Sequence, residues 1–201
     1  MGRGGLSVPR VFDFNTQLVI STGTSANQTI GEILLSVIPG STRAIQANQA
    51  NDKSGVDWWL EMTSGDFIAV DCKIRDEDPR VKFKADDLAL ETWSVVEKKV
   101  VGWTLDANKK TDYVFWIWKD TGRWCVVPFR LLMKAFQENM DEWKRIYRAA
   151  RQCTEGRYHS ECLFVPRSAV WLGMSKAAAG NSETLRKKVI AEQGTLFEVP
   201  A

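Results

Sequence analysis

Two aspartates and a lysine in the stretch GVDWWLEMTSGDFIAVDCKIR, residues 55–75, have the types and spacing that metal-assisted hydrolysis requires. Asp57 and Asp71 lie fourteen positions apart, and Lys73 follows Asp71 after one residue. Successive side chains of a strand point to opposite faces, so Asp71 and Lys73 share one face while Cys72 points to the other. Carboxylate oxygens bind hard cations, and a positive group beside them orients an attacking water or neutralises developing charge. The pattern predicts a site for phosphodiester hydrolysis, provided that a second carboxylate lies beside Asp71.

Asp57 supplies that carboxylate if the chain turns back at TSGD and brings the two strands side by side. A four-residue loop would place Asp57 opposite Cys72 and on the other face, whereas a three-residue loop or a bulge would place it with Asp71. Gly65 favours the shorter loop, because such loops commonly hold one residue at positive φ. The alternative interpretation is a surface hairpin whose charges merely flank its end.

These residues resemble the signature of the PD-(D/E)XK nuclease superfamily, in which an acidic residue is followed, after a gap, by acid-x-Lys on the next strand. The resemblance covers residues 26–130, and Val56 stands where the signature has a proline. In that superfamily a helix before the first strand often supplies a further glutamate, and Glu32 in TIGEILLSVI stands at that place. A solvated position on an amphipathic helix is the alternative for Glu32.

The resemblance implies an α/β fold with a restriction-endonuclease-like core, in which helices flank a four-stranded mixed sheet. It also implies cleavage of a nucleic-acid backbone with Mg²⁺, for which Mn²⁺ is a candidate substitute, and we take DNA as the expected substrate. Asp57, Asp71 and Glu32 would then be metal ligands together with the backbone carbonyl of Cys72, and Lys73 would orient the nucleophile.

Hydrophobic spacing predicts the elements that position these residues. Apolar residues at helical intervals predict a helix that ends at Pro39-Gly40, and RAIQAN, VDWWLEM and FIAVDCK predict a strand followed by a hairpin. DYVFWIW and RWCVVPF predict a second hairpin, residues 130–153 a helix, CLFVP a strand and SETLRKKVIAEQ a last helix. The segment RDEDPRVKFKADD reads as a loop, and LALETWSVVEKK is ambiguous. We expect one mixed sheet with helices packed on it, with an extension at 1–24, a nuclease-like domain at 25–175 and a helix and tail at 176–201.

Composition limits the classes of protein that remain. The 201 residues are 44% hydrophobic and carry a net charge of only +2, which excludes a uniformly basic surface. The sequence contains neither a signal-peptide pattern nor an apolar run long enough to span a bilayer, so we expect a cytoplasmic protein with no membrane partner.

A basic stripe is a candidate nucleic-acid contact. Four basic residues in DEWKRIYRAARQC fall at or beside helical steps of three and four: Lys144, Arg145, Arg148 and Arg151. They would follow phosphates if they share a helix face, and the alternative is a solvated face partly neutralised by neighbouring acids.

Two further groups of residues are undecided. Glu91 is a reserve metal ligand, although a capping or solvated role also fits it. Cys125, Cys153, His159 and Cys162 include no CxxC pair and lack the tight spacing of structural zinc sites, so buried thiols and a surface histidine are the simpler interpretation.

The end of the chain, QGTLFEVPA, places Leu196 and Phe197 in a short segment after the last predicted helix. QGTLF resembles the peptide by which replication and repair enzymes dock on the sliding clamp, with Gln193, Leu196 and Phe197 matching its glutamine, leucine and phenylalanine. Folding back onto the core is the alternative for these side chains.

Three functions fit these residues: a Mg²⁺-dependent DNA nuclease tethered to a sliding clamp, a non-catalytic adaptor with the same fold, and a dimeric resolvase of branched DNA. The sequence does not separate the resolvase from a simpler nuclease, nor DNA from RNA as the substrate.

Overall fold

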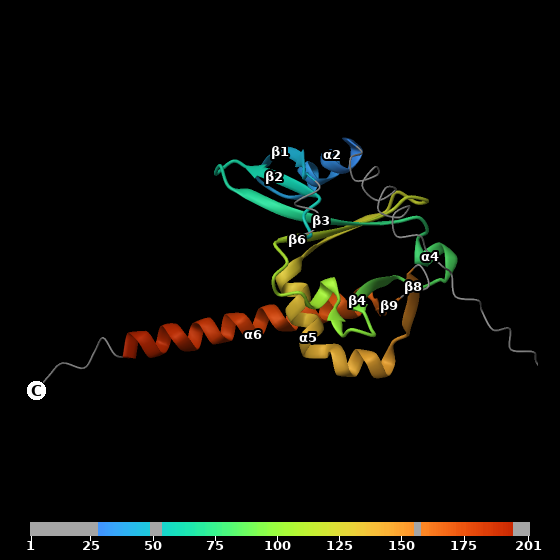
Figure 1. Cartoon of the computed structure of the whole chain (residues 1–201). Coiled ribbons are helices and arrows are strands. Elements are labelled where there is room, and N and C mark those ends of the chain that lie inside the picture. The colour runs from blue at the N-terminus through green and yellow to red at the C-terminus, as the bar shows by residue number, and fades with distance from the viewer. Residues whose placement is uncertain (1–27, 49–53, 155–157, 195–201) are drawn as a thin grey trace, which may run out of the picture.

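The computed structural model describes residues 28–48, 54–154 and 158–194, which form two β-sheets with helices packed on them (Figure 1). The first sheet has five strands in the order β1-β2-β3-β6-β7, and the second has four in the order β5-β4-β9-β8. The chain therefore has the predicted α/β class, but with two sheets where the sequence suggested one.

The first sheet is mixed. Its strands are β1 (Ser41–Gln46), β2 (Trp58–Met62), β3 (Phe67–Arg75), β6 (Tyr113–Trp118) and β7 (Trp124–Pro128). The pairs β1–β2, β2–β3 and β6–β7 are antiparallel, whereas β3 and β6 pair in parallel. Helix α2 (Gln28–Val37) precedes β1 and covers one face of this sheet, because Ile30 and Leu34 pack in a cluster with Trp58, Cys72 and Phe115.

The turn between β2 and β3 has the predicted three-residue loop. The Met62 N–H donates to the Asp66 carbonyl at 2.9 Å, and residues 63–65 lie outside this pair. Gly65 has a φ of 86°, which a residue with a side chain rarely adopts.

The second sheet is antiparallel and is interleaved with the first along the chain. It contains β4 (Asp87–Val95), β5 (Val100–Val101), β8 (Ala149–Thr154) and β9 (Tyr158–Pro166). The helical elements around it are α4 (Pro79–Lys82), the 3₁₀ turn η1 (Trp103–Leu105), α5 (Phe129–Ile146) and α6 (Arg167–Gly194). The ambiguous segment LALETWSVVEKK forms most of β4, where Leu88 and Leu90 are buried.

The helix predicted over residues 130–153 is present only as far as Ile146, and the prediction was wrong for the residues that follow. Helix α5 ends at Ile146, and Tyr147 has extended backbone angles. The following residues pair with β9, as Ala149 with Leu163 and Arg151 with Glu161. Pairing with a distant strand therefore overrides the local helical spacing of the basic residues.

The main core lies where the second sheet meets the first sheet and the helices. It contains buried residues of β4, β6, β7, β9, α5 and α6, including Trp116, Phe129, Phe136 and Leu163. Helix α6 begins in this core and then extends well beyond the rest of the molecule (Figure 1). The boundary predicted at residue 176 therefore lies within one continuous helix. Among the described residues, no helix is long and apolar enough to cross a membrane.

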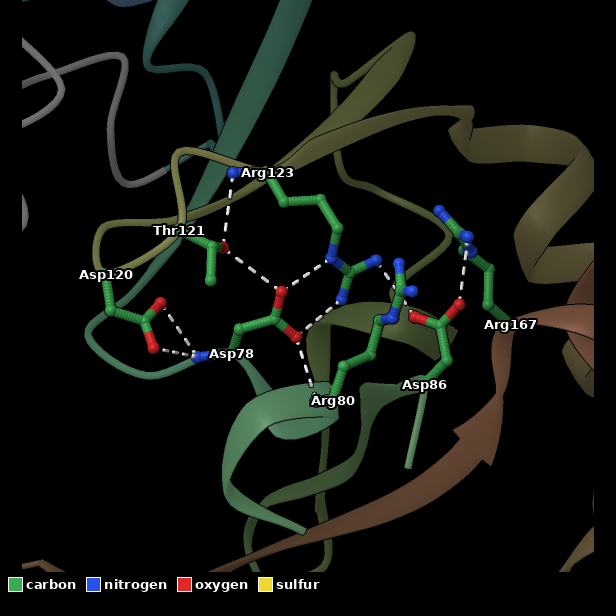
Figure 2. A network of polar contacts seen from close by, with 7 residues as sticks. All are labelled: Asp78, Arg80, Asp86, Asp120, Thr121, Arg123 and Arg167. Carbon is green, nitrogen blue, oxygen red and sulfur yellow. Dashed lines mark hydrogen bonds and ion pairs between the residues drawn. The ribbon is translucent and has the colours of Figure 1, made fainter. Parts of the chain in front are cut away.

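A charged network at one side of the molecule connects the two sheets (Figure 2). Both oxygens of Asp78 accept from the Arg123 guanidinium, at 2.6 and 2.8 Å, and Asp78 also caps α4 by accepting from the Arg80 N–H. Arg123 donates to Asp86, just before β4, and Asp86 also pairs with Arg167 at the start of α6. The Arg123 guanidinium makes Asp78 more acidic, so the pKa of Asp78 falls from its ordinary value of 3.8 to about 2.

Candidate functional site

Strand β3 presents Asp71, Lys73 and Arg75 to the second sheet. Asp71 pairs with Val114, Lys73 with Trp116 and Arg75 with Trp118, and these three partners belong to the main core. Cys72, between them, faces the α2 side of the sheet. The predicted alternation of side chains along β3 is confirmed.

Asp71 is a buried carboxylate held by two ammonium groups. It is only 3% exposed, and the Nζ atoms of Lys73 and Lys109 each lie 2.8 Å from its Oδ2. Burial raises the pKa of Asp71, but the two lysines together outweigh this effect, and the pKa lies below its ordinary value. Asp71 is therefore ionised at neutral pH.

Lys109 is a site residue that the sequence analysis did not identify. It lies in the loop after η1, and the Arg130 guanidinium fixes this loop by donating to the Lys109 carbonyl at 2.8 Å. Its side chain lies across Gly55, where a Cβ atom would come within 2.0 Å of the Nζ. Gly55 has a φ of 78°, so its lack of a side chain serves both the backbone conformation and the passage of the lysine.

Asp57 lies beside the same strand. Its Oδ2 accepts a hydrogen bond of 2.5 Å from the Cys72 N–H, which belongs to the peptide that joins Asp71 to Cys72. The Asp57 N–H donates to the Val70 carbonyl at 2.9 Å, although the register partner of Val70 is Trp58. The structure thus brings the carboxylate of Asp57 to the backbone of β3, next to Asp71. Burial, followed by the charges of Asp57 and Asp71, raises the pKa of the Cys72 thiol.

Glu32 has a different location. It is exposed on α2, and this helix covers the face of the first sheet opposite to Asp71 and Lys73. The structure therefore does not bring Glu32 together with the charged groups on the other face.

Glu91 faces the site from the second sheet. Its Oε2 accepts from the Trp103 N–H at 3.0 Å, and the Trp103 ring lies 4.8 Å from the Lys73 Nζ. Burial and the Glu91 charge raise the pKa of Cys162 to about 11, while Arg75 and Lys73 act in the opposite direction. The Glu91 carboxylate thus holds the backbone of Trp103, the residue whose ring contacts Lys73.

The candidate ligands for a divalent cation at this site are carboxylate oxygens. Mg²⁺ typically takes one or two carboxylates and completes its octahedral shell with waters and substrate phosphates. Asp57 and Asp71 supply two carboxylates, and the Oδ2 of Asp71 is already paired with the ammonium groups of Lys73 and Lys109. Within the part of the chain that the structure describes, no group of three or more His, Cys, Asp or Glu side chains could hold a metal.

The residues considered for zinc are distributed over three strands. Cys153 and His159 are cross-strand neighbours on β8 and β9, and the His159 Nδ1 lies 2.5 Å from the Glu97 Oε1. Cys125 is in β7 and belongs to the main core, where burial raises its pKa to about 12. Cys162 lies on the opposite face of β9 from the buried Leu163, next to Glu91.

The predicted basic stripe does not lie on one helix. Lys144 and Arg145 are exposed in the last turn of α5, whereas Arg148 and Arg151 follow the end of the helix. Arg151 pairs with Glu161 at 2.9 Å, and the Arg148 guanidinium lies 4.1 Å from the Phe164 ring centre. The prediction that these four residues share one helix face was wrong, because α5 ends at Ile146 and β8 begins at Ala149.

The residues of the predicted clamp-binding peptide are largely outside the described part of the chain. Gln193 belongs to the end of α6, and Leu196 and Phe197 lie outside the described residues.

No protein-family model, curated protein or solved structure matches the chain.

Proposed function

We propose that the protein is a Mg²⁺-dependent nuclease that hydrolyses phosphodiester bonds in DNA at Asp57, Asp71 and Lys73. The observation that carries the proposal is the convergence at β3: Asp71 and Lys73 share a face, and the carboxylate of Asp57 is bonded to the adjacent peptide. A mixed sheet with a helix before its first strand adds support, because the resemblance to the PD-(D/E)XK superfamily implies this arrangement.

Each residue has a role that follows from its charge and surroundings. Asp57 and Asp71 would hold the cation, which supplies charge neutralisation at the phosphate and a more acidic bound water. Lys73 is placed by its ion pair with Asp71 and by the Trp103 ring, so its ammonium is directed toward the space between the sheets. There it would orient the attacking water or stabilise the charge that develops on the phosphate.

Lys109 adds a feature to this proposal. In the structure it occupies the same Asp71 oxygen as Lys73, and its side chain is only 8% exposed. Lys109 neutralises Asp71 before a cation binds, which lowers the cost of burying that carboxylate. The cation and Lys109 would then compete for Asp71.

The test is cleavage of labelled linear, single-stranded, flapped and four-way DNA with Mg²⁺, Mn²⁺ or a chelator. We expect products only with metal, and we expect Asp71→Asn to abolish them while DNA binding stays nearly unchanged, because it removes a ligand without removing phosphate contacts. Asp66→Asn is the matched control, since Asp66 is an exposed carboxylate in the turn of the same hairpin. Intact DNA in every lane, or equal loss of binding and cleavage in Asp71→Asn, would refute the proposal.

A non-catalytic adaptor is the second candidate function. The pairing of Asp71 with two lysines favours it, because the carboxylate already has two cationic partners in the protein itself. In this case Asp71 stabilises the fold, and the tail with Gln193, Leu196 and Phe197 docks on a sliding clamp. Capture of the clamp by the intact protein but not by Leu196→Ala/Phe197→Ala, together with no cleavage under any metal condition, would favour the adaptor.

A further inference from the structure

A cavity of about 460 Å³ opens between the two sheets near the end of β3. Its wall includes Arg75, which lies two residues beyond Lys73 on the same face of the strand. The cavity is therefore the continuation of the candidate site along β3. Its volume lies in the range of small-ligand pockets, roughly 300–1,000 Å³.

The inner walls of this cavity are aromatic and apolar. Trp116 and Trp118 line it from β6, and Phe164 and Ala89 line it from β9 and β4. Both tryptophans are almost completely buried, and Trp118 is further held by the Arg123 guanidinium at 3.9 Å from its ring centre. Rigid rings on one sheet facing a ring on the other suit a flat ligand that stacks.

Charged groups stand around these walls. Arg75, Arg148 and Glu77 are exposed lining residues, and Asp87 is a half-buried one. The Arg148 guanidinium covers one side of the Phe164 ring. Guanidinium groups bind phosphate oxygens, and carboxylates accept hydrogen bonds from the N–H groups on the edge of a base.

We propose that this cavity receives one unpaired nucleobase of a DNA strand, with the adjoining phosphates on Arg75 and Arg148. The proposal rests on the nucleic-acid substrate proposed for the neighbouring site, and it specifies that substrate further. The enzyme would select strands with an unpaired or easily extruded nucleotide, because removing a base from a paired stack costs free energy. The scissile phosphate would then lie next to the bound nucleotide, toward Lys73.

Binding is measured by fluorescence anisotropy in chelator, so that the result does not depend on cleavage. The probes are a labelled duplex with one unpaired adenine and the same duplex with an abasic residue in its place. Stacking is worth about 1–3 kcal/mol per base, so the adenine probe should bind about tenfold more tightly. Equal affinities would overturn the cavity proposal while leaving the metal-dependent cleavage assay to decide the nuclease proposal separately.

Two variants locate the effect. Ala89→Leu fills the cavity and Phe164→Leu removes one ring, and both should reduce the preference for adenine, with thermal unfolding as the check on folding. Arg43→Gln, an exposed residue of β1, should keep the full preference. Unchanged preference in a folded Phe164→Leu protein would place the base elsewhere and refute the proposal. Free dAMP that displaces the adenine probe as well as an unlabelled oligonucleotide does would assign the cavity to mononucleotides instead.

Discussion

Two buried aspartates in this protein are held in opposite ways. Asp78 is surrounded by a guanidinium fork, a threonine hydroxyl and a helix-cap N–H, which together engage both of its oxygens (Figure 2). Asp71 has two lysine ammonium groups, and both lie on the same oxygen. An arginine fork has a fixed geometry, whereas a lysine is a flexible stem with a point charge at its end. The comparison indicates that Asp78 is a structural carboxylate with fixed partners, whereas the partners of Asp71 can be exchanged.

The largest expected effect is the loss of Asp78. Asp78→Asn removes the carboxylate that accepts two hydrogen bonds from the Arg123 guanidinium, leaves Asp86 as its remaining acidic partner, and arginine cannot compensate by losing its proton. We expect a loss of about 3–4 kcal/mol in the free energy of unfolding, as for other broken buried ion pairs. Asp71→Asn should cost less, about 1–2 kcal/mol, because each lysine can move its ammonium toward solvent. Urea unfolding measures both, and a larger loss for Asp71→Asn would reverse the comparison.

A smaller effect is expected from substitutions at Gly55, the residue that the Lys109 side chain crosses to reach Asp71. Gly55 and Gly65 both have positive φ, but a Cβ at Gly65 meets nothing within 4 Å, whereas one at Gly55 meets Lys109. Gly65→Ala should lower the free energy of unfolding by about 1 kcal/mol, from backbone strain alone. Gly55→Ala should lower it by about 2 kcal/mol, because it also displaces Lys109. In a Lys109→Ser protein, Gly55→Ala should lower the free energy of unfolding by no more than Gly65→Ala does. Equal costs in both backgrounds would show that Lys109 does not lie across Gly55.

A comparable effect is expected in the dependence of stability on acidic pH. The pKa of Asp78 is lower in the folded protein, so its stabilisation is present above the unfolded value of 3.8 and is lost as the pH falls toward about 2. Between pH 5 and 2, the free energy of unfolding of the wild type should fall by about 1–2 kcal/mol more than that of Asp78→Asn, because the variant has no carboxylate at position 78 to protonate. Parallel pH profiles of chemical unfolding would contradict the strong pairing of Asp78 with Arg123.

The sequence predicted the local part of this site better than the long-range part. Asp71 and Lys73 share a face because strands alternate, and the loop at Gly65 follows from the turn residues. Lys109 is separated from Asp71 by 38 positions along the chain, and no local spacing connects the two. Gly55 could not be recognised as a site residue from the sequence. A side chain is excluded there because Lys109, from a distant loop, occupies the space that a Cβ atom would take.

The fold shows the same division. The first sheet was largely predicted, because its strands are apolar runs and α2 has clear helical spacing. Of the second sheet only part of β9 was predicted, as the strand CLFVP, because β4 mixes polar and apolar residues and β8, AARQCT, continues the helical spacing of α5. Strand β4 is stabilised by pairing with β9, where the partner of Glu91 is Cys162, 71 positions later in the chain. Strand β8 also pairs with β9, which follows it closely in the chain. Such pairing is a property of the folded chain and not of a window of sequence.

The interleaving of the two sheets also orders events during synthesis on the ribosome. Strand β4 emerges soon after β3, but its partner β9 ends only at Pro166, so the whole intervening segment must be synthesised before this pairing forms. The cavity needs Phe164 for its far wall, and therefore no nascent fragment that ends before β9 contains it. A growing chain in which Asp71 and Lys73 have already emerged would still lack the cavity beside them. The chain order thus delays the assembly of the whole site until β9 has been synthesised.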